Sequence, residues 1–254
     1  MPQDHKQGAL GEFVEVVKTV VYALLIALVL RVLLFQPFTI PSASMEPTLL
    51  EGDYIIVSKY SYGWSRNSIP FSPPLFKGRL FERPAERGDV VVFKLPRDGH
   101  TDYIKRLIGL PGDRVQMKAG QIYINGVAVP HQAEAPVKWD VGYGYEREVG
   151  RFKEELPGPG GATFTTQDFG PDGEVDNTPV FVVPQGNYFM MGDNRDNSLD
   201  SRWPEAIGVG FVPAENLIGR PRLILVSWKG GAEIFKPWTW FLDARPSRFL
   251  RILK

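Results

Sequence analysis

One long apolar stretch lies near the start of the chain, and the pattern after it repeats on a shorter scale. Residues 14–35 read VEVVKTVVYALLIALVLRVLLF, with an uninterrupted apolar run at 19–30. As a helix, this run spans about 18 Å and the whole stretch about 33 Å, against a hydrocarbon layer of about 30 Å. The stretch is long enough if Lys18 and Arg31 extend their charges to the membrane surfaces. The pattern predicts one transmembrane helix.

Positive charges set the expected orientation of this helix. Two lysines and the amino terminus flank its start, and after Arg31 no Lys or Arg occurs until Lys59. Positive flanks stay on the cytoplasmic side of a membrane. We therefore expect residues 1–36 to form a cytoplasmic N-terminus and anchor, and residues 37–254 to form an extracytoplasmic domain.

A cleaved secretory signal is the alternative for the same stretch, because signal peptides also have short apolar regions. The nearest small-x-small cleavage site is Pro41-Ser42-Ala43. Cleavage there would separate Ser42 from Ser44, although both belong to one candidate loop. A retained anchor is therefore favoured.

Beyond residue 37 the chain shows short β-rich runs between turn residues. These runs are rich in β-branched and aromatic residues and lie at 54–57, 89–93, 103–108 and 223–226. Alternating residues around Asn-Gly at 121–129 predict a hairpin. Helical periodicity is limited to one turn at 213–217 and a basic amphipathic tail at 246–254. We predict a mostly β catalytic domain built from antiparallel sheets.

Residues 132–186 differ from their surroundings. They are rich in Gly and Pro, with PGPGG at 157–161, and contain few apolar runs. We interpret this segment as an insertion or cap on the β core, without a catalytic unit of its own.

Composition excludes several classes of function. Lys and Arg total 29, as do Asp and Glu, so no nucleic-acid partner is indicated. The chain contains no cysteine, which excludes thiol catalysis and disulfides. With only three histidines, it offers little for a histidine-rich metal site. We expect neither a metal nor a cofactor.

The loop at 41–49, PSASMEPTL, combines two prolines with two nearby serines. Pro41 and Pro47 restrict its backbone, and Ser42 and Ser44 lie two residues apart. A serine nucleophile needs an exposed hydroxyl on a rigid turn, with donors for the developing oxyanion. Taken alone, the pattern is more typical of an ordinary turn.

Lys105 lies in the middle of the strand-like run 103–108. Alternation along a strand leaves its direction open, toward the core or toward water, and exposure is the commoner case. Burial would lower the pKa of its amine, and the neutral amine can act as a base near neutral pH.

The polar run at 192–202, GDNRDNSLDSR, is typical of a solvated loop or of a network that holds other groups in place. The EF-hand template for calcium does not fit it. Counted from Asp193, Arg195 occupies position 3 and position 6 is not Gly; counted from Asp196, position 12 is Ile207 instead of Glu. A supporting polar network is the better interpretation.

Other nucleophile patterns are missing from the sequence. It contains no Gly-x-Ser-x-Gly and no Ser-x-x-Lys. A Ser-His-Asp triad would need His5, His100 or His131, and none of them has a distinctive setting.

These segments, in this order behind an apolar anchor, resemble bacterial signal peptidase I, a Ser-Lys protease. Residues 41–48 match the family's nucleophile segment PSxSMxPT, and 103–113 match its lysine segment. The segment GDVVVF at 88–93 matches a third, and 192–202 match GDNRDNSxDSR at every fixed position. The resemblance covers nearly all of 31–228, and is weakest across the Gly- and Pro-rich segment.

The resemblance implies a role for each matched residue. Ser44 would be the nucleophile, Lys105 the general base, and Ser42 an oxyanion donor beside the Ser44 backbone N–H. The supporting residues would be Ser198, which orients the Lys105 amine, and the bracing pair Asp200 and Arg202.

The resemblance also implies a reaction and a location. Members of the family remove signal peptides from exported preproteins, cutting after small residues at −1 and −3. The chain would then be a single-pass serine endopeptidase of the bacterial cytoplasmic (inner) membrane, with its catalytic domain on the periplasmic side. Its partners would be signal-peptide-bearing preproteins and membrane lipid.

Distance along the chain agrees with this location. Ser44 lies nine residues after Phe35, within about 30 Å of the membrane surface. A substrate held by its own apolar segment requires a nucleophile at such a height. Aromatic residues nearby are candidates for the interface: Trp64, Phe71, Phe76 and Phe81.

Two features depart from the family pattern. Ala43 stands where many members have Gly, which suits a tight loop nearly as well. One anchor precedes Ser44, whereas some relatives have two, and this bears on topology more than on chemistry.

Two other functions stay open at this point. One is a related Ser-Lys protease that cleaves itself or one partner, as in the SOS-repressor group, although those proteins are soluble. The other is a non-catalytic anchored β-domain that binds envelope proteins.

Overall fold

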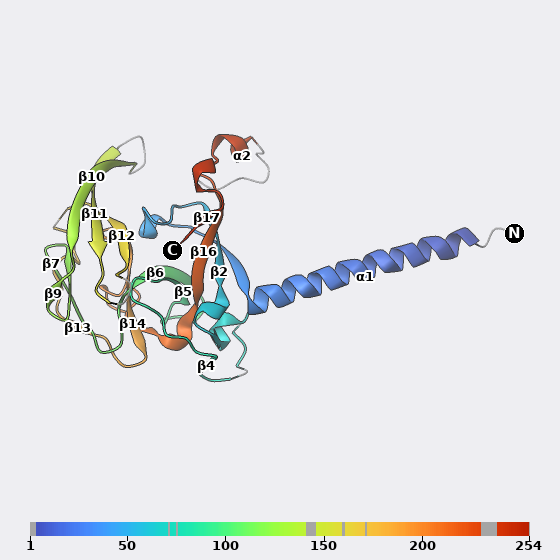
Figure 1. Ribbon diagram of the computed structural model, residues 1–254, viewed down its shortest axis with the longest axis horizontal. Coiled ribbons are helices and arrows are strands. Elements are labelled where there is room, and N and C mark those ends of the chain that lie inside the picture. The colour runs from blue at the N-terminus through green and yellow to red at the C-terminus, as the bar shows by residue number, and fades with distance from the viewer. Residues whose placement is uncertain are drawn as a thin grey trace.

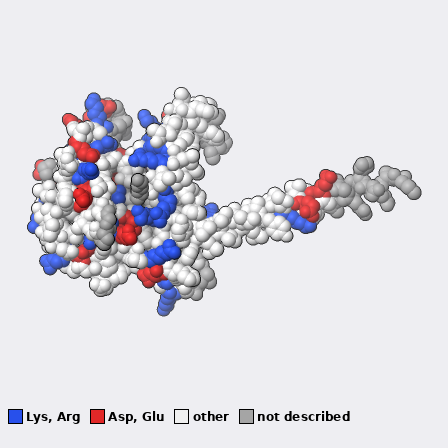
Figure 2. Space-filling view, in the orientation of Figure 1, with Lys and Arg blue, Asp and Glu red and all other residues white. Residues whose placement is uncertain are grey.

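The computed structural model describes residues 4–70, 72–74, 76–140, 146–158, 161–170, 172–229 and 238–253. Helix α1 (Asp4–Leu33) projects from a β-rich body as a single rod (Figure 1). Its part Gly11–Leu33 has the length and apolarity of a membrane span, and none of it is buried in the protein. In Figure 2 the stretch of helix next to the body is nearly without charge.

This exposed apolar surface confirms the predicted N-terminal helix. Transfer of each Leu or Val side chain out of water is worth roughly 1.5–3 kcal/mol, so a lipid environment stabilises such a helix. The helix ends at Leu33, two residues before the end of the apolar stretch, and Phe35 begins strand β1 (Phe35–Thr39).

The main sheet confirms the predicted antiparallel β architecture. It has eight strands in the order β1-β2-β16-β5-β6-β14-β15, and β17 pairs with β16. After β1, its members are β2 (Asp53–Ser58), β5 (Val90–Lys94), β6 (Asp102–Gly109), β14 (Asn187–Met191), β15 (Val212–Pro213), β16 (Leu217–Ser227) and β17 (Arg251–Ile252). All four strand-like runs expected from the sequence lie in this sheet.

A second sheet contains the expected hairpin. Its order is β13-β7-β8-β9, formed by β7 (Arg114–Lys118), β8 (Gln121–Ile124), β9 (Val127–Ala128) and β13 (Phe181–Val182). Asn125 and Gly126 connect β8 to β9 with φ of 53° and 83°. Two successive positive φ angles are what a type I′ turn requires, which is why Asn-Gly occurs there.

The segment 132–186 contains strands that the sequence did not predict. A third sheet has the order β10-β11-β12, with strands β10 (His131–Asp140), β11 (Glu146–Glu155) and β12 (Thr163–Asp168). These strands lie at the far side of the body from α1 (Figure 1). Most side chains of β11 are exposed or half-buried, so its sequence lacks the apolar alternation of a core strand.

Short elements complete the described chain. They are the strand pair β3 (Trp64–Ser65) and β4 (Arg79–Leu80), helix α2 (Thr239–Leu242), and five 3₁₀ turns: η1 (Ala43–Met45), η2 (Lys59–Ser61), η3 (Arg66–Ser68), η4 (Ala214–Asn216) and η5 (Pro246–Arg248). Turn η4 confirms the single turn expected at 213–217.

The basic amphipathic helix expected at 246–254 was wrong. The tail forms η5 and then β17, which pairs with β16. The physical reason is Arg248, whose guanidinium is buried and pairs with Asp53 at 3.0 Å and 2.5 Å. It also donates to the Thr48 carbonyl at 3.1 Å, so the tail supports the candidate nucleophile loop.

Strand β5 explains how the core holds the candidate site. Val91 and Phe93 face one apolar cluster, while Val90 and Val92 face another that also contains Met45. A strand buried on both faces has a continuous apolar sequence, as observed. Because Met45 comes from the loop that contains Ser44, the core fixes this loop against β5.

Candidate active site

Ser44 lies in turn η1, between a buried side chain and a polar loop. Met45 and Leu49 are fully buried, which anchors the segment in the core. The Ser44 carbonyl accepts a hydrogen bond from the Asn194 backbone at 3.2 Å, and the Asn194 side chain donates to the Ala43 carbonyl at 3.2 Å. The backbone around Ser44 is therefore held from both sides, as a nucleophile requires.

Lys105 points toward Ser44, which settles the direction that strand alternation left open. It lies opposite Val91 in the pairing of β5 with β6 and is only 4% exposed. Its Nζ lies 2.6 Å from the Ser44 Oγ and 3.0 Å from the Ile104 carbonyl oxygen. Burial lowers the pKa of Lys105 to about 8, although the Asp200 and Asp193 carboxylates act in the opposite direction.

Ser42 lies beside Ser44 on the open side of the loop. Its backbone is extended, with φ −146° and ψ 156°, and its Oγ lies 3.4 Å from the Ser44 Oγ. Both serines and Lys105 line a cavity of about 380 Å³. The remaining wall is formed by Pro41, Thr101, Asp102, Tyr103, Ile104, Asn197 and Leu199. A substrate chain in this cavity would meet all three groups.

Ser198 is buried, but it makes no hydrogen bond to Lys105. Its hydroxyl has no hydrogen-bond partner among the described residues. It packs on Gly192, where an added Cβ would lie 2.3 Å from the Ser198 Oγ and 2.5 Å from the Ser44 carbonyl oxygen. Only glycine fits between these groups, and the expected orienting role of Ser198 stays a prediction.

Asp200 and Arg202 form the expected pair beneath the site. Both side chains are fully buried, and the Arg202 Nε lies 2.9 Å from an Asp200 oxygen. Asp200 also accepts the Gly192 N–H at 2.9 Å, and Arg202 donates to the Arg195 carbonyl at 2.5 Å. The pair therefore fixes both ends of the loop that follows β14.

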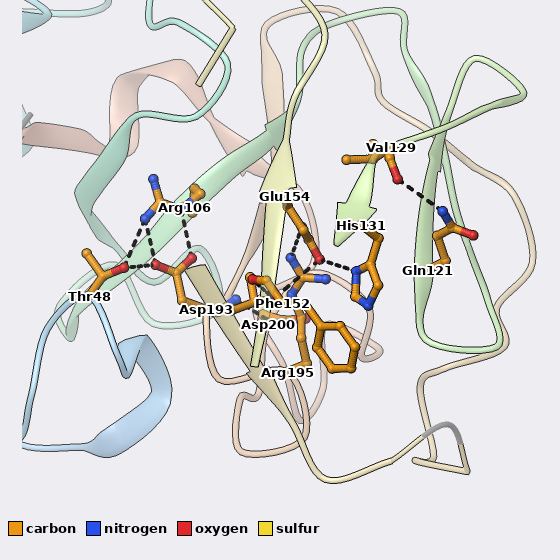
Figure 3. A network of polar contacts seen from close by, with 12 residues as sticks. Thr48, Arg106, Gln121, Val129, His131, Phe152, Glu154, Asp193, Arg195 and Asp200 are labelled. Atoms are coloured by element: carbon orange, nitrogen blue, oxygen red, sulfur yellow. Dashed lines mark hydrogen bonds and ion pairs between the residues drawn. The ribbon is translucent and has the colours of Figure 1, made fainter. Parts of the chain in front are cut away.

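A second buried ion pair was missed by the sequence reasoning. Arg106 pairs with Asp193 through two contacts of 2.7 Å and 2.6 Å, and Thr48 donates to the same carboxylate at 2.5 Å (Figure 3). All three residues occur in the matched segments, so their positions in those motifs were the available signal. The pair joins the nucleophile loop, β6 and the 192–202 loop.

Glu154 links the third sheet to this site. It is almost completely buried and pairs with Arg195, and its carboxylate lies 3.2 Å from the His131 Nδ1 (Figure 3). No sequence pattern pointed to Glu154, because it lies in a polar strand without a motif. Residues 132–186 thus supply the partner that neutralises a buried arginine of the 192–202 loop.

The arrangement can perform proton transfer. A hydroxyl 2.6 Å from a buried amine can pass its proton to that amine once the amine is neutral. An amine pKa of about 8 makes the neutral form accessible near neutral pH.

Comparisons with known proteins show the family of this chain. The family described as "Signal peptidase, peptidase S26" matches residues 13–228. Signal peptidase I of Rickettsia typhi is 45% identical over 216 residues, covering 82% of this chain and 78% of the relative. That of Rickettsia canadensis is 45% identical over 224 residues, covering 84% of this chain and 79% of the relative.

A solved structure was also found among similar proteins. It is the crystal structure of a signal peptidase I from Enterococcus faecalis V583, with 27% identity and a TM-score of 0.31. The alignment covers 54% of this chain and 97% of that one. The assignment therefore rests on the sequence matches, and the one long apolar helix among the described residues fits a single-pass membrane protein.

The family match extends over most of the chain and includes the segments that hold Ser44 and Lys105. The expectation drawn from the four motifs is confirmed: the chain belongs to the signal peptidase I family and is a serine endopeptidase, a hydrolase.

Proposed function

We propose that this protein removes N-terminal signal peptides from exported preproteins with a Ser44–Lys105 dyad. The observation that carries the proposal is the 2.6 Å contact between the Ser44 Oγ and the buried Lys105 Nζ. The similar proteins of Rickettsia are named signal peptidase I, and the proposed substrates are those of this family.

The proposed reaction has two stages. Neutral Lys105 takes the Ser44 proton as the Oγ attacks the scissile carbonyl carbon, and the oxyanion is stabilised by the Ser42 hydroxyl and the Ser44 backbone N–H. The protonated Lys105 amine then gives its proton to the amide nitrogen of the scissile bond. The bond breaks, the mature protein leaves with a new amino terminus, and the signal peptide stays as an ester on Ser44. A water molecule, deprotonated by Lys105, hydrolyses this ester and restores both residues.

The wall of the cavity supports the binding of apolar substrate residues. Pro41, Tyr103, Ile104 and Leu199 give it apolar surface next to the two serines. Apolar side chains at −1 and −3 would fit against these walls, and their small size is what the family implies.

Membrane lipid is a further proposed partner, supported by exposed aromatic surfaces. Trp64 donates to the Leu33 carbonyl at 2.8 Å, and Phe81 is 80% exposed beside it. Phe241 and Leu242 of α2 are also exposed, in a region that is white in Figure 2. Both α2 and β4 lie toward the side from which α1 leaves the body (Figure 1). Of the expected interface aromatics, Phe71 lies outside the described residues.

We further propose that the anchor lies in the bacterial cytoplasmic membrane with the catalytic domain on the periplasmic side. The support is the scarcity of positive charge after the apolar run, together with the export substrates.

The decisive experiment is cleavage of a peptide with an Ala-x-Ala site by full-length protein in detergent. We expect cleavage after the second alanine, and losses of at least about 10³-fold in Ser44→Ala and Lys105→Ala. The exposed residues Ser247 and Lys153 supply matched controls, since their alanine variants should keep wild-type rates.

Other outcomes separate the remaining functions. Cleavage of the chain itself without cleavage of the peptide would indicate a self-processing protease. A wild-type protein that cleaves neither would contradict the proposal and favour a binding domain.

A further inference from the structure

Three aspartates meet behind the 192–202 loop, away from Ser44. Asp168 ends β12, Asp176 follows in the next loop, and Asp196 belongs to the 192–202 loop. One carboxylate oxygen of each lies within 4.8 Å of the other two. The expectation of no metal rested on the absence of Cys, the few His and the EF-hand mismatch of 192–202, whereas two of these acids come from another segment.

The three carboxylates share one pattern of hydrogen bonds. One oxygen of Asp168, Asp176 and Asp196 accepts a backbone N–H of the loop after β12, at 2.7, 2.8 and 2.6 Å respectively. The other oxygen of each accepts no hydrogen bond from the part of the chain that the structure describes. No described Lys, Arg or His forms an ion pair with any of the three. The three carboxylates therefore lie close together, and each has one oxygen that accepts no hydrogen bond from the described residues.

Asp176 provides an independent sign that a partner belongs there. Its side chain is fully buried, and its Oδ1 has no hydrogen-bond partner among the described residues. Burying an unpaired carboxylate is costly unless a cation or a proton neutralises it. The buried arginines nearby form their ion pairs elsewhere, Arg195 with Glu154 and Arg202 with Asp200, although the charges of both act on the Asp176 carboxylate without a hydrogen bond to it.

We propose that Asp168, Asp176 and Asp196 bind a hard divalent cation. Carboxylate oxygens without nitrogen or sulfur ligands select ions such as Ca²⁺, and an irregular loop suits its flexible coordination. Of the three aspartates, Asp196 lines an open cavity of about 420 Å³, together with Gly173 and Arg147, so solvent reaches one carboxylate of the group.

Gly173 fits this assignment. A Cβ at this position would lie 2.3 Å from the Asp196 Oδ1 and 2.9 Å from the Asp176 Oδ2. Any side chain there would push two of the three carboxylates apart. Glycine therefore allows the loop to bring them together.

The position of the three aspartates gives a bound cation a structural role. A bound cation would tie β12 to the loop that contains Ser198, two residues after Asp196, and so stabilise the active-site loop without touching the reacting atoms.

The test is calcium binding by full-length protein in detergent, depleted of divalent ions with EDTA and dialysed. Calorimetric titration with CaCl₂ should show saturable binding of one ion. Thermal unfolding should shift upward by roughly 5–10 °C at about a hundredfold excess over Kd, relative to NaCl of equal ionic strength. Glu174→Gln, an exposed acid of the same loop, should behave like the wild type.

Asp176→Asn and Asp196→Asn should lose both the binding and the shift. If Asp176→Asn does not fold, the half-buried Asp196 gives the deciding variant. The proposal is overturned if the wild type binds no calcium saturably, or if both variants bind as it does. A wild type that is insensitive to calcium and less stable than Asp176→Asn would show that a proton, not a cation, neutralises the group.

Discussion

The amine of Lys105 is subject to two opposing influences. Burial favours its neutral form, whereas the Asp200 and Asp193 carboxylates favour its charged form, and the balance places its pKa at about 8. About one amine in ten is then neutral at pH 7. In the proposed mechanism only the neutral amine accepts the Ser44 proton, so this balance would set the pH range of activity.

We predict that kcat/KM falls on the acid side of pH 8, approaching tenfold per pH unit as Lys105 becomes protonated. Above pH 8 the rate should level off. Lys105→Arg should be inactive, since guanidinium stays charged at any workable pH. A pH series with a peptide substrate checks this, and a flat profile from pH 6 to 9 or an active arginine variant would contradict the assignment.

Ser42 tests whether an oxyanion donor lies beside the nucleophile. Its Oγ is 3.4 Å from the Ser44 Oγ, on the cavity side. Loss of one preorganised donor costs about 10²–10³ in kcat, so Ser42→Ala should lower kcat by that factor with little change in KM. Ser42→Thr should recover much of the activity. Steady-state kinetics would refute the role if KM rises while kcat holds.

Neither His100 nor His131 is expected to take part in catalysis. His131 contacts Glu154 and His100 lies on an exposed turn, and neither is bonded to Ser44. The double variant His100→Ala/His131→Ala should keep kcat/KM within about tenfold, whereas loss of a triad member costs 10³ or more. A large loss of kcat/KM in a well-folded double variant would show that a histidine takes part in catalysis.

At the scale of elements, the C-terminal tail shows how a buried charge overrides helical periodicity. We predict that Arg248→Ala lowers the free energy of unfolding by about 3–5 kcal/mol, because it leaves the Asp53 carboxylate buried and unpaired. Denaturant unfolding measures this change. Arg251→Ala, at an exposed arginine of the same tail, should stay within about 0.5 kcal/mol of wild type. Equal losses in the two variants would contradict this account.

The difference between local sequence patterns and distant contacts explains how much of the structure could be predicted from the sequence. Apolar runs predicted the strands of the main sheet, and Asn-Gly predicted the β8–β9 hairpin, because local rules decide both. The strands β10 and β11 were missed because most of their side chains are exposed or half-buried, so neither strand has the apolar alternation of a core strand. The motifs identified Ser44 and Lys105, but their 2.6 Å contact depends on the pairing of β5 with β6, which no single segment encodes.

At the scale of the whole molecule, topology is open to a direct test because the chain has no cysteine. A cysteine introduced at exposed Ser247 should react with a membrane-impermeant maleimide in cells whose outer barrier is opened. A cysteine at Gln7 should react only after the cytoplasmic membrane is disrupted. Labelling in the opposite order would reverse the proposed orientation.

The connection between helix α1 and the β-rich body is short and held by hydrogen bonds. Strand β1 begins two residues after α1 ends, the Lys59 N–H bonds the Leu34 carbonyl at 2.9 Å, and Trp64 bonds Leu33. The body therefore stands at a fixed height above the end of its own membrane helix. Consider a substrate whose apolar helix lies in the same bilayer. Each residue added to that helix moves the scissile bond after it by about 1.5 Å, so three added residues move the scissile bond by about 4.5 Å. That exceeds the spacing of about 3.3 Å between residues of an extended chain. We therefore expect the position of cleavage to depend on the length of the apolar helix of the substrate.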